Sequence, residues 1–194
     1  MTLVIHTSPD RPTRQCGECT LCCKLLPVRS LDKGAGERCK HQSHARGCKV
    51  YARLTSVSPE CRLWSCRWLV NDDAGDLRRP DRSHYVLDVM PDFVTHDDGE
   101  IRTAVPVIQV WVDPAHRDAY RDPALRAYLD RRGAEGYAAL IRYSDTEGFA
   151  LFPPAMTPDG SWREVKSNSV GPTHTVDDVV RALSGRLPSG GSAS

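Results

Sequence analysis

Eight cysteines lie between Cys16 and Cys66, and the 128 residues that follow contain none. The chain opens this series with the run Cys16-Gly-Glu-Cys19-Thr-Leu-Cys22-Cys23. A two-residue gap between cysteines lets one turn direct two sulfurs at a single ion, a spacing that zinc and iron–sulfur sites both use. We therefore predict a metal site. Its candidate ligands are the thiols of Cys16, Cys19, Cys22, Cys23, Cys39, Cys48, Cys61 and Cys66.

The number and order of these thiols leave two kinds of metal open, zinc or iron. Eight thiolates equal two tetrahedral zinc sites of four ligands each. The first three cysteines also match the start of the bacterial ferredoxin signature, and an iron–sulfur cluster would then need a remote fourth ligand among the later cysteines. Adjacent Cys22 and Cys23 point in different directions, so they more naturally serve two metals, or one metal and the packing around it. His41 and His44 could substitute as ligands, but we expect them to be solvated loop histidines.

The sequence also indicates where such thiols would be found. A disulfide framework is the rival interpretation, but it is typical of short secreted chains. Residues 1–10 have neither a basic segment nor a long apolar segment, so they do not resemble a secretory signal. We therefore expect a cytoplasmic protein, because thiols are kept reduced there. No apolar stretch approaches the ~20 residues that span a bilayer, and we expect no membrane partner.

Charge is divided unevenly along the chain. Residues 1–66 carry 11 Lys/Arg and 5 Asp/Glu, a net charge of +6, whereas residues 67–194 carry 15 and 20. Positive charge near a thiol favours the ionised sulfur, which is the form that binds metal. The basic residues are scattered and few aromatic residues lie among them, which argues against a nucleic-acid partner. Metal ions are the partners that the sequence predicts.

The order of the cysteines resembles that of a known family. The run Cys16-x2-Cys19-x2-Cys22-Cys23 is followed by Cys39, by Gly47-Cys48-Lys49-Val50-Tyr51 and by Cys61-Arg62-x3-Cys66-x-Trp68-Leu69. Residues 16–69 in this order resemble the CxxCxxCC, or YkgJ-like, cysteine-cluster family, which is regarded as a zinc- or iron-chelating domain. Some relatives carry the cluster in proteins connected with flagellin lysine methylation. The resemblance implies a chelating role for the eight cysteines.

The composition of the chain divides it into regions that must position these thiols. We expect a flexible N-terminus over residues 1–15 and a metal-organised cysteine module over residues 16–70. The polar, turn-rich segment 71–76 then opens a body, residues 71–187, whose sequence is that of an ordinary core-forming domain. Residues 188–194, which are Pro188 followed only by Gly, Ser and Ala, are expected to form a flexible tail.

The body shows strand patterns first. β-Branched and aromatic residues predict strands over 85–90 and 104–112, and Pro106 predicts that the second lies at a sheet edge or starts late. Asp97-Asp98-Gly99 between them predicts a hairpin turn. Further strands are predicted over residues 138–143, 148–152 and 162–165.

Helix patterns alternate with these strands. A helix is predicted over residues 122–133, with Asp122 as its cap. Its buried stripe is predicted to consist of Leu125, Tyr128 and Leu129. Thr175, followed three residues later by Asp178, predicts a capping box that opens a final helix reaching residue 187. The expected fold class is α+β, with the cysteine module packed on a mostly antiparallel sheet with two helices.

These patterns favour a cytoplasmic metal-binding protein that chelates zinc or an iron–sulfur cluster in a structural or redox role. The alternative is an enzyme, an oxidoreductase or a methyltransferase-associated protein, that uses an open coordination position or an unligated thiol such as Cys23. The sequence contains no phosphate-binding glycine loop, GxSxG elbow or HExxH motif. The histidines of the body are expected to lie at the surface or to be satisfied by neighbours; they are His84, His96, His116 and His174. The four tryptophans are expected in the core or against the cysteines; they are Trp64, Trp68, Trp111 and Trp162.

Overall fold

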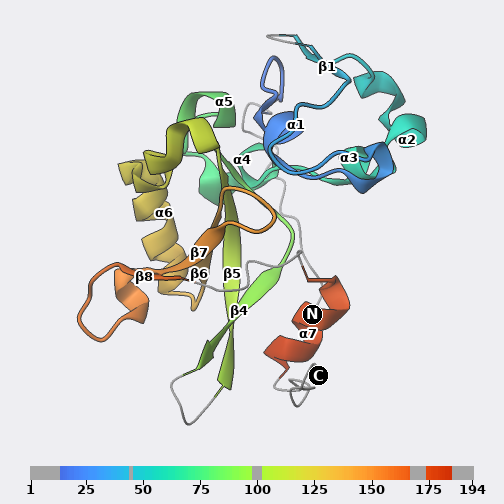
Figure 1. Cartoon of the computed structure of the whole chain (residues 1–194). Helices are drawn as coiled ribbons and strands as arrows, with labels where there is room; N and C mark the ends of the chain where they lie inside the picture. The colour runs from blue at the N-terminus through green and yellow to red at the C-terminus, as the bar shows by residue number, and fades with distance from the viewer. Residues whose placement is uncertain (1–13, 44–45, 98–101, 167–173, 185–194) are drawn as a thin grey trace.

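The computed structural model describes residues 14–43, 46–97, 102–166 and 174–184. Within these ranges the chain forms a six-stranded sheet with helices on both faces, and short helices gather beside one end of the sheet (Figure 1). This is the α+β class with a mostly antiparallel sheet that the sequence predicted. Residues 1–13 of the predicted N-terminus and the whole predicted tail lie outside the described residues.

The sheet is organised around one long strand. The strands are β3 (Tyr85–Leu87), β4 (Asp92–Asp97), β5 (Arg102–Val112), β6 (Ala138–Arg142), β7 (Gly148–Phe152) and β8 (Arg163–Val165). Their order is β3-β5-β6-β7-β8, and β4 pairs with the same edge of β5 as β3 does. β5 and β6 are parallel, and the other pairings among the described strands of this sheet are antiparallel. The three later strands confirm the sequence prediction to within one residue.

The first predicted strand is shorter than expected. β3 ends at Leu87, and the chain resumes as β4 only at Asp92, so the strand predicted over residues 85–90 is wrong at its second half. β4 escaped prediction because Asp92-Phe-Val-Thr-His-Asp97 has two adjacent hydrophobic residues and no alternation. The predicted hairpin does join β4 to β5, where Asp97 faces Arg102, but residues 98 and 99 lie outside the described ranges.

Pro106 lies inside a central strand, so the prediction of an edge strand or a late start is wrong. β5 begins at Arg102 and has partner strands along both edges. Pro106 faces Phe93 of β4, whereas pairing with β6 begins one residue later, at Val107. Pro106 therefore has a neighbouring strand on one side only, and the local geometry resembles the edge position that proline requires.

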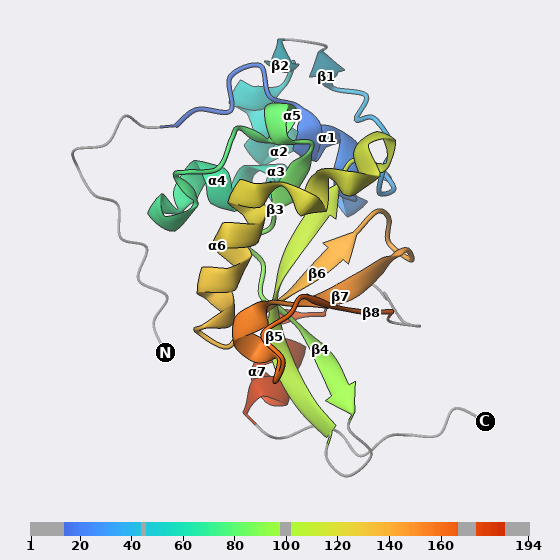
Figure 2. The same ribbon diagram turned by 90° about the vertical axis from the view of Figure 1, so that its left-hand side faces the viewer.

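Helix α6 (Pro123–Gly133) covers one face of the sheet, as Figure 2 shows. The Asp122 carboxylate accepts a hydrogen bond from the N–H of Ala124, which confirms the predicted cap. The predicted stripe is buried, and it packs against side chains of β5 and β6 such as Val110 and Ile141. Because α6 connects β5 to β6 as a crossover, these two strands run parallel.

The opposite face of the sheet is shared by two elements, α7 (Val176–Leu183) and the cysteine module (Figure 1). α7 packs on β4 and β5, and its capping box between Thr175 and Asp178 confirms the prediction. The helix ends at Leu183, and residues 185–187 of the predicted helix lie outside the described ranges. The part of the chain that the structure describes has no helix both long and apolar enough to cross a membrane.

The cysteine module consists of very short elements. They are α1 (Leu21–Leu25), η1 (Arg29–Leu31), β1 (Gln42–Ser43), β2 (Gly47–Cys48), η2 (Tyr51–Arg53), α2 (Leu54–Val57), α3 (Pro59–Leu63) and α4 (Arg67–Val70). Helices of four or five residues are far below the ~12–15 residues at which an isolated helix becomes even marginally stable in water. Tertiary interactions must therefore hold these elements in place.

Most buried apolar side chains of the cysteine module lie near its two ends. Among the described residues from Arg29 to Leu63, the buried hydrophobic side chains are those of Val50 and Leu54. Tyr51 is 60% exposed and Leu63 is 86% exposed. A segment of this length cannot bury enough apolar area to offset its conformational entropy with two side chains.

The connection to the body is packed more tightly than its polar composition suggested. Segment 71–76 contains the turn η3 (Asp72–Ala74), and Ala74 is fully buried in the main core together with Leu77. The carbonyl oxygen of Leu77 accepts a hydrogen bond from the Trp68 indole at 2.9 Å. A further short helix, α5 (Pro80–Ser83), leads into β3. The segment is thus a packed connection between the cysteine module and the body.

Candidate metal centre

The first two cysteines lie on a tight turn. The N–H of Cys19 donates to the carbonyl oxygen of Cys16 at 2.8 Å, and this bond closes the turn. Gly17 inside it has φ of +50°, in the left-handed region that glycine adopts at little cost. The chain then enters α1, whose first turn carries Cys22 and Cys23. The two-residue spacing therefore produces the local turn that the sequence predicted.

Two later cysteines are tied to this segment by the backbone. The N–H of Cys39 donates to the carbonyl oxygen of Cys23 at 3.0 Å, and the Cys39 carbonyl accepts from Gln42 at 2.9 Å. Gln42 pairs with Cys48 in the β1–β2 ladder. The Cys39 sulfur accepts a bond of 3.4 Å from the backbone N–H of His41. This ladder brings the Cys39 and Cys48 region to the first turn of α1.

The last two cysteines flank the end of the cysteine module. Cys61 lies half-buried in α3, and Cys66 precedes α4 as its N-cap. Cys66 is 8% exposed and packs with Leu21 and Leu25 of α1 against Val86 of the sheet. The remaining seven thiols are half-buried, and all eight are free rather than joined in disulfides.

The thiols are close enough to one another to affect their ionisation. Burial is the main reason that the pKa is raised for five of them, namely Cys16, Cys19, Cys48, Cys61 and Cys66. For Cys66 the pKa rises to about 11, and negative charge on Cys16 and Cys19 adds to the effect of burial. A metal that binds here must displace protons from these thiols.

The pKa values of the two adjacent cysteines of α1 shift in opposite directions. A hydrogen bond between the two thiols raises the pKa of Cys22, and burial adds to that rise. The same bond lowers the pKa of Cys23 to about 7, with a further lowering by the charge of Lys33. Cys23 is therefore the thiol best prepared to be a thiolate near neutral pH, and only the thiolate binds metal or acts as a nucleophile.

Lys33 is a buried cation beside the thiols. Its ammonium donates to the carbonyl oxygens of Lys24 at 3.3 Å and Gly34 at 3.0 Å, and also to that of Leu26. Burial lowers the pKa of Lys33, and negative charge on cysteine thiolates, that of Cys39 first, works in the other direction. Three carbonyl acceptors match the three donors of an ammonium group, so the site holds a positive charge near the sulfurs.

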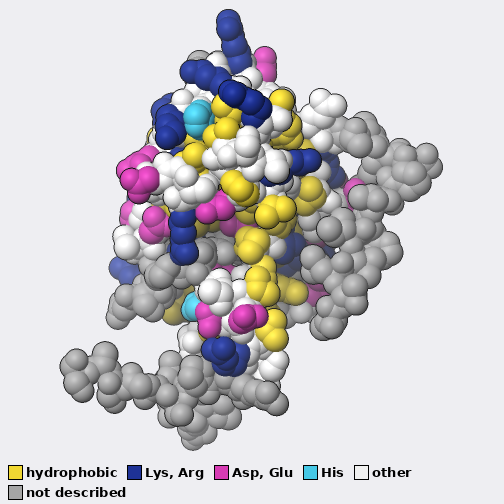
Figure 3. Space-filling view, turned by 90° about the vertical axis from the view of Figure 1, so that its right-hand side faces the viewer, with side chains coloured by type: hydrophobic (Ala, Val, Ile, Leu, Met, Phe, Trp, Pro, Cys, Tyr) yellow, Lys and Arg dark blue, Asp and Glu magenta, His cyan; other side chains and the backbone are white. Residues whose placement is uncertain are grey.

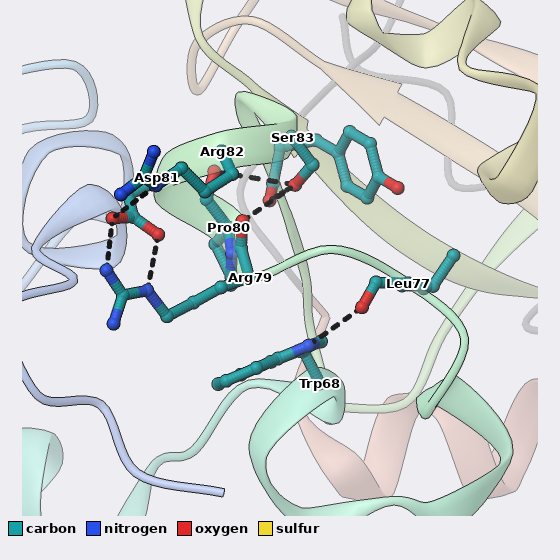
Figure 4. A network of polar contacts seen from close by, with 8 residues as sticks. Trp68, Leu77, Arg79, Pro80, Asp81, Arg82 and Ser83 are labelled. Carbon is teal, nitrogen blue, oxygen red and sulfur yellow. Dashed lines mark hydrogen bonds and ion pairs between the residues drawn. The ribbon is translucent and has the colours of Figure 1, made fainter.

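Arg79 is a second cation, on the side of the first turn (Figure 4). Its guanidinium makes two hydrogen bonds of 2.7 Å to the Asp81 carboxylate, which orients it. Its charge counteracts the rise in the pKa of Cys16 and of Cys19. The sequence did not predict that Lys33 and Arg79 would lie beside the thiols. Figure 3 shows Lys and Arg side chains gathered at the end of the molecule that the cysteine module forms, in keeping with the uneven charge along the chain.

Asp88 joins the cysteine module to the sheet, at the break between β3 and β4. It forms an isolated antiparallel bridge with Cys66 and accepts a bond of 2.7 Å from the indole N–H of Trp64. Its carbonyl oxygen accepts a bond of 2.9 Å from Arg67. Burial raises the pKa of this carboxyl. Trp111, fully buried, packs with this cluster, which confirms that the tryptophans lie in the core or against the cysteines.

The histidines take no evident part in the centre. His41 contacts Cys39 through its backbone, and His44 lies outside the described residues. Elsewhere, His84 and His116 stack with ring centroids 3.6 Å apart, and the His174 ring lies 2.6 Å from a carboxylate oxygen of Asp92. These three rings therefore contact neighbouring groups, as predicted. The side chain of His96 lies outside the described part of the structure.

The described side chains form no coordination shell. In the ranges that the structure describes, no group of three or more His, Cys, Asp or Glu side chains is arranged to hold a metal ion. The donor chemistry nevertheless suits a soft or borderline metal, because the available donors are thiols and the neighbouring charges are cationic. Binding would therefore require the thiols to reorient toward a shared ion.

Comparisons with known families, with curated proteins and with solved structures found no match. The resemblance to the cysteine-cluster family therefore stays a prediction that depends on the order of the cysteines alone.

Proposed function

We propose that this protein binds metal through the thiolates of the cysteine module, as zinc or as an iron–sulfur cluster. The observation that carries the proposal is the pairing of eight free, half-buried or buried thiols with a segment whose middle, from Arg29 to Leu63, buries two hydrophobic side chains among its described residues. Such a segment needs another source of stability, and bound metal supplies it, because metal-binding free energy becomes folding free energy. The reduced thiols would belong in a reducing compartment such as the cytoplasm.

The residues around the thiols would assist binding in three ways. Lys33 and Arg79 supply positive charge, which favours thiolates over thiols. Gly17 and the Cys16–Cys19 turn present two sulfurs from one loop. Bound zinc would supply a rigid cross-link between segments, and an iron–sulfur cluster would add electron transfer. The proposed role is therefore structural or redox.

The alternative expected from the sequence is an enzyme with an open coordination position or a reactive thiol. The low pKa of Cys23 is the observation that favours it, since a thiolate at neutral pH is a nucleophile. The same property suits a metal ligand, and the hydrogen bond from Cys22 holds Cys23 among the other thiols. We therefore favour metal binding, with catalysis as an outcome that the experiment below would reveal.

The test is the composition of protein purified without oxygen. Metal analysis and acid-labile sulfide assay should find zinc without sulfide, or iron with sulfide, bound to the full chain. A protein that contains no metal after anaerobic purification, and takes up neither zinc nor iron afterwards, would contradict the proposal. The matched control is Ser56→Ala, because Ser56 is an exposed module residue whose hydroxyl bonds only within its own turn. Its metal content should equal that of the unsubstituted protein.

Alkylation separates the enzyme alternative from metal binding. If all eight thiols are ligands, a thiol reagent should leave the metal-loaded protein unmodified and should label it after chelation. Rapid labelling of Cys23 alone in the loaded protein would instead indicate an unligated nucleophile and favour the enzyme.

A further inference from the structure

The eight thiols separate into two groups in space, and the division does not follow their order in the sequence. The first group is assembled on Cys66. Cys66 packs in one apolar cluster with Cys19 and Cys22. Cys16 is joined to Cys19 by the hydrogen bond of the turn. Cys66 also lies near enough to Cys16 and Cys19 for their negative charge to raise its pKa, which agrees with this grouping.

The second group is assembled on Cys23. The backbone of Cys39 is bonded to that of Cys23, and the β1–β2 ladder holds Cys48 beside the Cys39 turn. Cys61 of α3 and Cys48 both lie near enough to Cys23 and Cys39 for their charges to act on them, and neither belongs to the apolar cluster that holds Cys66, Cys19 and Cys22. These thiols therefore lie near one another although 38 positions separate the first from the last.

The two groups meet at neighbouring residues. Cys22 and Cys23 are adjacent in α1 and share a hydrogen bond, and negative charge on Cys23 also raises the pKa of Cys16. The backbone of the β1–β2 ladder also approaches that of the Cys16–Cys19 turn directly. A Cβ atom on Gly47 would lie 2.7 Å from the carbonyl oxygen of Gly17, so the ladder and the first turn approach at a point where only glycine fits.

We propose that the eight thiols form two separate sites of four thiolates, the first from Cys16, Cys19, Cys22 and Cys66 and the second from Cys23, Cys39, Cys48 and Cys61. Each site takes one divalent cation that prefers tetrahedral sulfur coordination, of which zinc is the type. This inference rests on the proposed metal-binding function and specifies how the ligands divide. It explains the adjacent cysteines of α1, since each serves a different ion.

The distribution of cations supports two sites. Four thiolates around one divalent ion leave a net charge of about −2. Arg79 acts on Cys16 and Cys19 of the first site. Lys33 interacts most with Cys39 and Cys23 of the second site, and less with Cys22 of the first. Each site therefore has one cation that acts mainly on its own thiols, and the two cations come from different segments of the chain. Both sites also span the cysteine module, since the first closes it at Cys66 and the second holds its middle.

The test is the zinc stoichiometry of the full chain, measured by native mass spectrometry after reconstitution with Zn²⁺ under anaerobic conditions. The unsubstituted protein should bind two ions. Cys66→Ser should remove one ion from the first site, Cys61→Ser should remove one ion from the second, and the double variant should bind none. Loss of both ions in each single variant would overturn the division, and so would retention of both ions.

A second measurement needs no variant. With ¹¹³Cd²⁺ as the probe, the full chain should give two cadmium resonances, and each should correlate with the β-protons of the four cysteines assigned to its site. A single resonance, or correlations that mix the two sets, would overturn the division. Iron with sulfide in the native protein would overturn two mononuclear sites while supporting the proposed function. A chain that binds no metal would refute both.

Discussion

The cysteine module and the body are stabilised in different ways. The body buries large side chains such as Trp111, Tyr128 and Leu129 between α6, the sheet and α7. The cysteine module has helices of four or five residues, and the hydrophobic side chains buried among the described residues from Arg29 to Leu63 are those of Val50 and Leu54. The body can therefore fold by apolar burial. The cysteine module needs a different source of stability, and under the proposed function bound metal would supply it.

The contrast also appears in the polar groups. In the body, charged groups mostly serve caps and ion pairs, as with Asp122 at α6 and Arg142 beside Asp92. In the cysteine module, Lys33 is buried by carbonyl oxygens beside several thiols. A buried cation beside sulfur is costly in a metal-free protein, but it becomes favourable when the thiols ionise around a metal. The comparison predicts that the two regions respond differently to the same perturbations.

Metal removal should have the largest effect, and only on the cysteine module. Structural zinc contributes about 10–16 kcal/mol of apparent binding free energy at neutral pH. Chelation should therefore unfold residues 16–70 and leave the sheet folded. Hydrogen exchange would measure this, with the Cys39 and Lys49 amides losing protection while those of β5 and β6 keep it.

Restoring Zn²⁺ to the chelated protein should restore protection and serves as the control. A cysteine module whose amides stay protected without metal would break the comparison, since it would show that this region is stabilised in the same way as the body.

Truncation of a side chain in the main core should have the next largest effect. It should destabilise the body and leave the metal content of the cysteine module unchanged. Leu129 is 1% exposed in the core beneath α6. Leu129→Ala should lower the free energy of unfolding of the body by about 2–5 kcal/mol, measured by denaturant unfolding of the metal-loaded protein. Its metal content should stay unchanged.

Leu63→Ala is the matched control, because this module leucine is 86% exposed. It should change the free energy of unfolding by less than about 0.5 kcal/mol. A Leu129→Ala protein that lost its metal would show that the cysteine module depends on the body for its binding geometry.

The junction between the two regions should be sensitive to Asp88. Asp88→Ala leaves the Trp64 indole and the N–H of Met90 without their acceptor. The cost should be about 1–3 kcal/mol, and it should appear in the unfolding of both regions because Trp64 belongs to the cysteine module and Met90 to the body.

Asp88→Asn is the control, because its amide oxygen can still accept both bonds. Burial raises the pKa of Asp88, so the folded state holds its proton more tightly than the unfolded chain. Its contribution to stability is full below the unfolded pKa of ~3.9 and is lost as pH rises through the folded pKa. The asparagine variant should lack this component, and it should be at least as stable as the original protein at neutral pH. A less stable asparagine variant at neutral pH would contradict this account.

The smallest effect is expected at the cap of α7. Thr175→Ala removes the hydroxyl that accepts from the N–H of Asp178, at a cost of about 0.5–2 kcal/mol. Amide exchange within α7 should quicken, and metal content should stay the same. Thr175→Ser retains the capping oxygen and should behave like the original. Equal exchange in the alanine and serine variants would show that packing alone holds α7 on the sheet.

Sequence reasoning located the elements whose signals are local. The helix after Asp122 and the capping box at Thr175 are set by residues within one turn, and both were predicted. β4 was missed because its residues lack alternation, and it forms a strand only because β5 offers an edge. Pro106 was misplaced for a related reason, because the length of β6 decides whether a proline in β5 lacks a neighbour.

The candidate centre likewise combines features set by local sequence with features set by tertiary contacts. The sequence by itself determined that eight thiols lie within one third of the chain, with a turn between Cys16 and Cys19 and a basic surrounding segment. Only the tertiary structure decided that Cys66 lies with the first turn, that Cys61 lies with Cys23, and that Lys33 and Arg79 are the adjacent cations. The physical reason is distance along the chain. Neighbouring residues are constrained by the backbone itself, whereas contacts across tens of residues exist only when packing against the sheet repays the entropy of closing the loop.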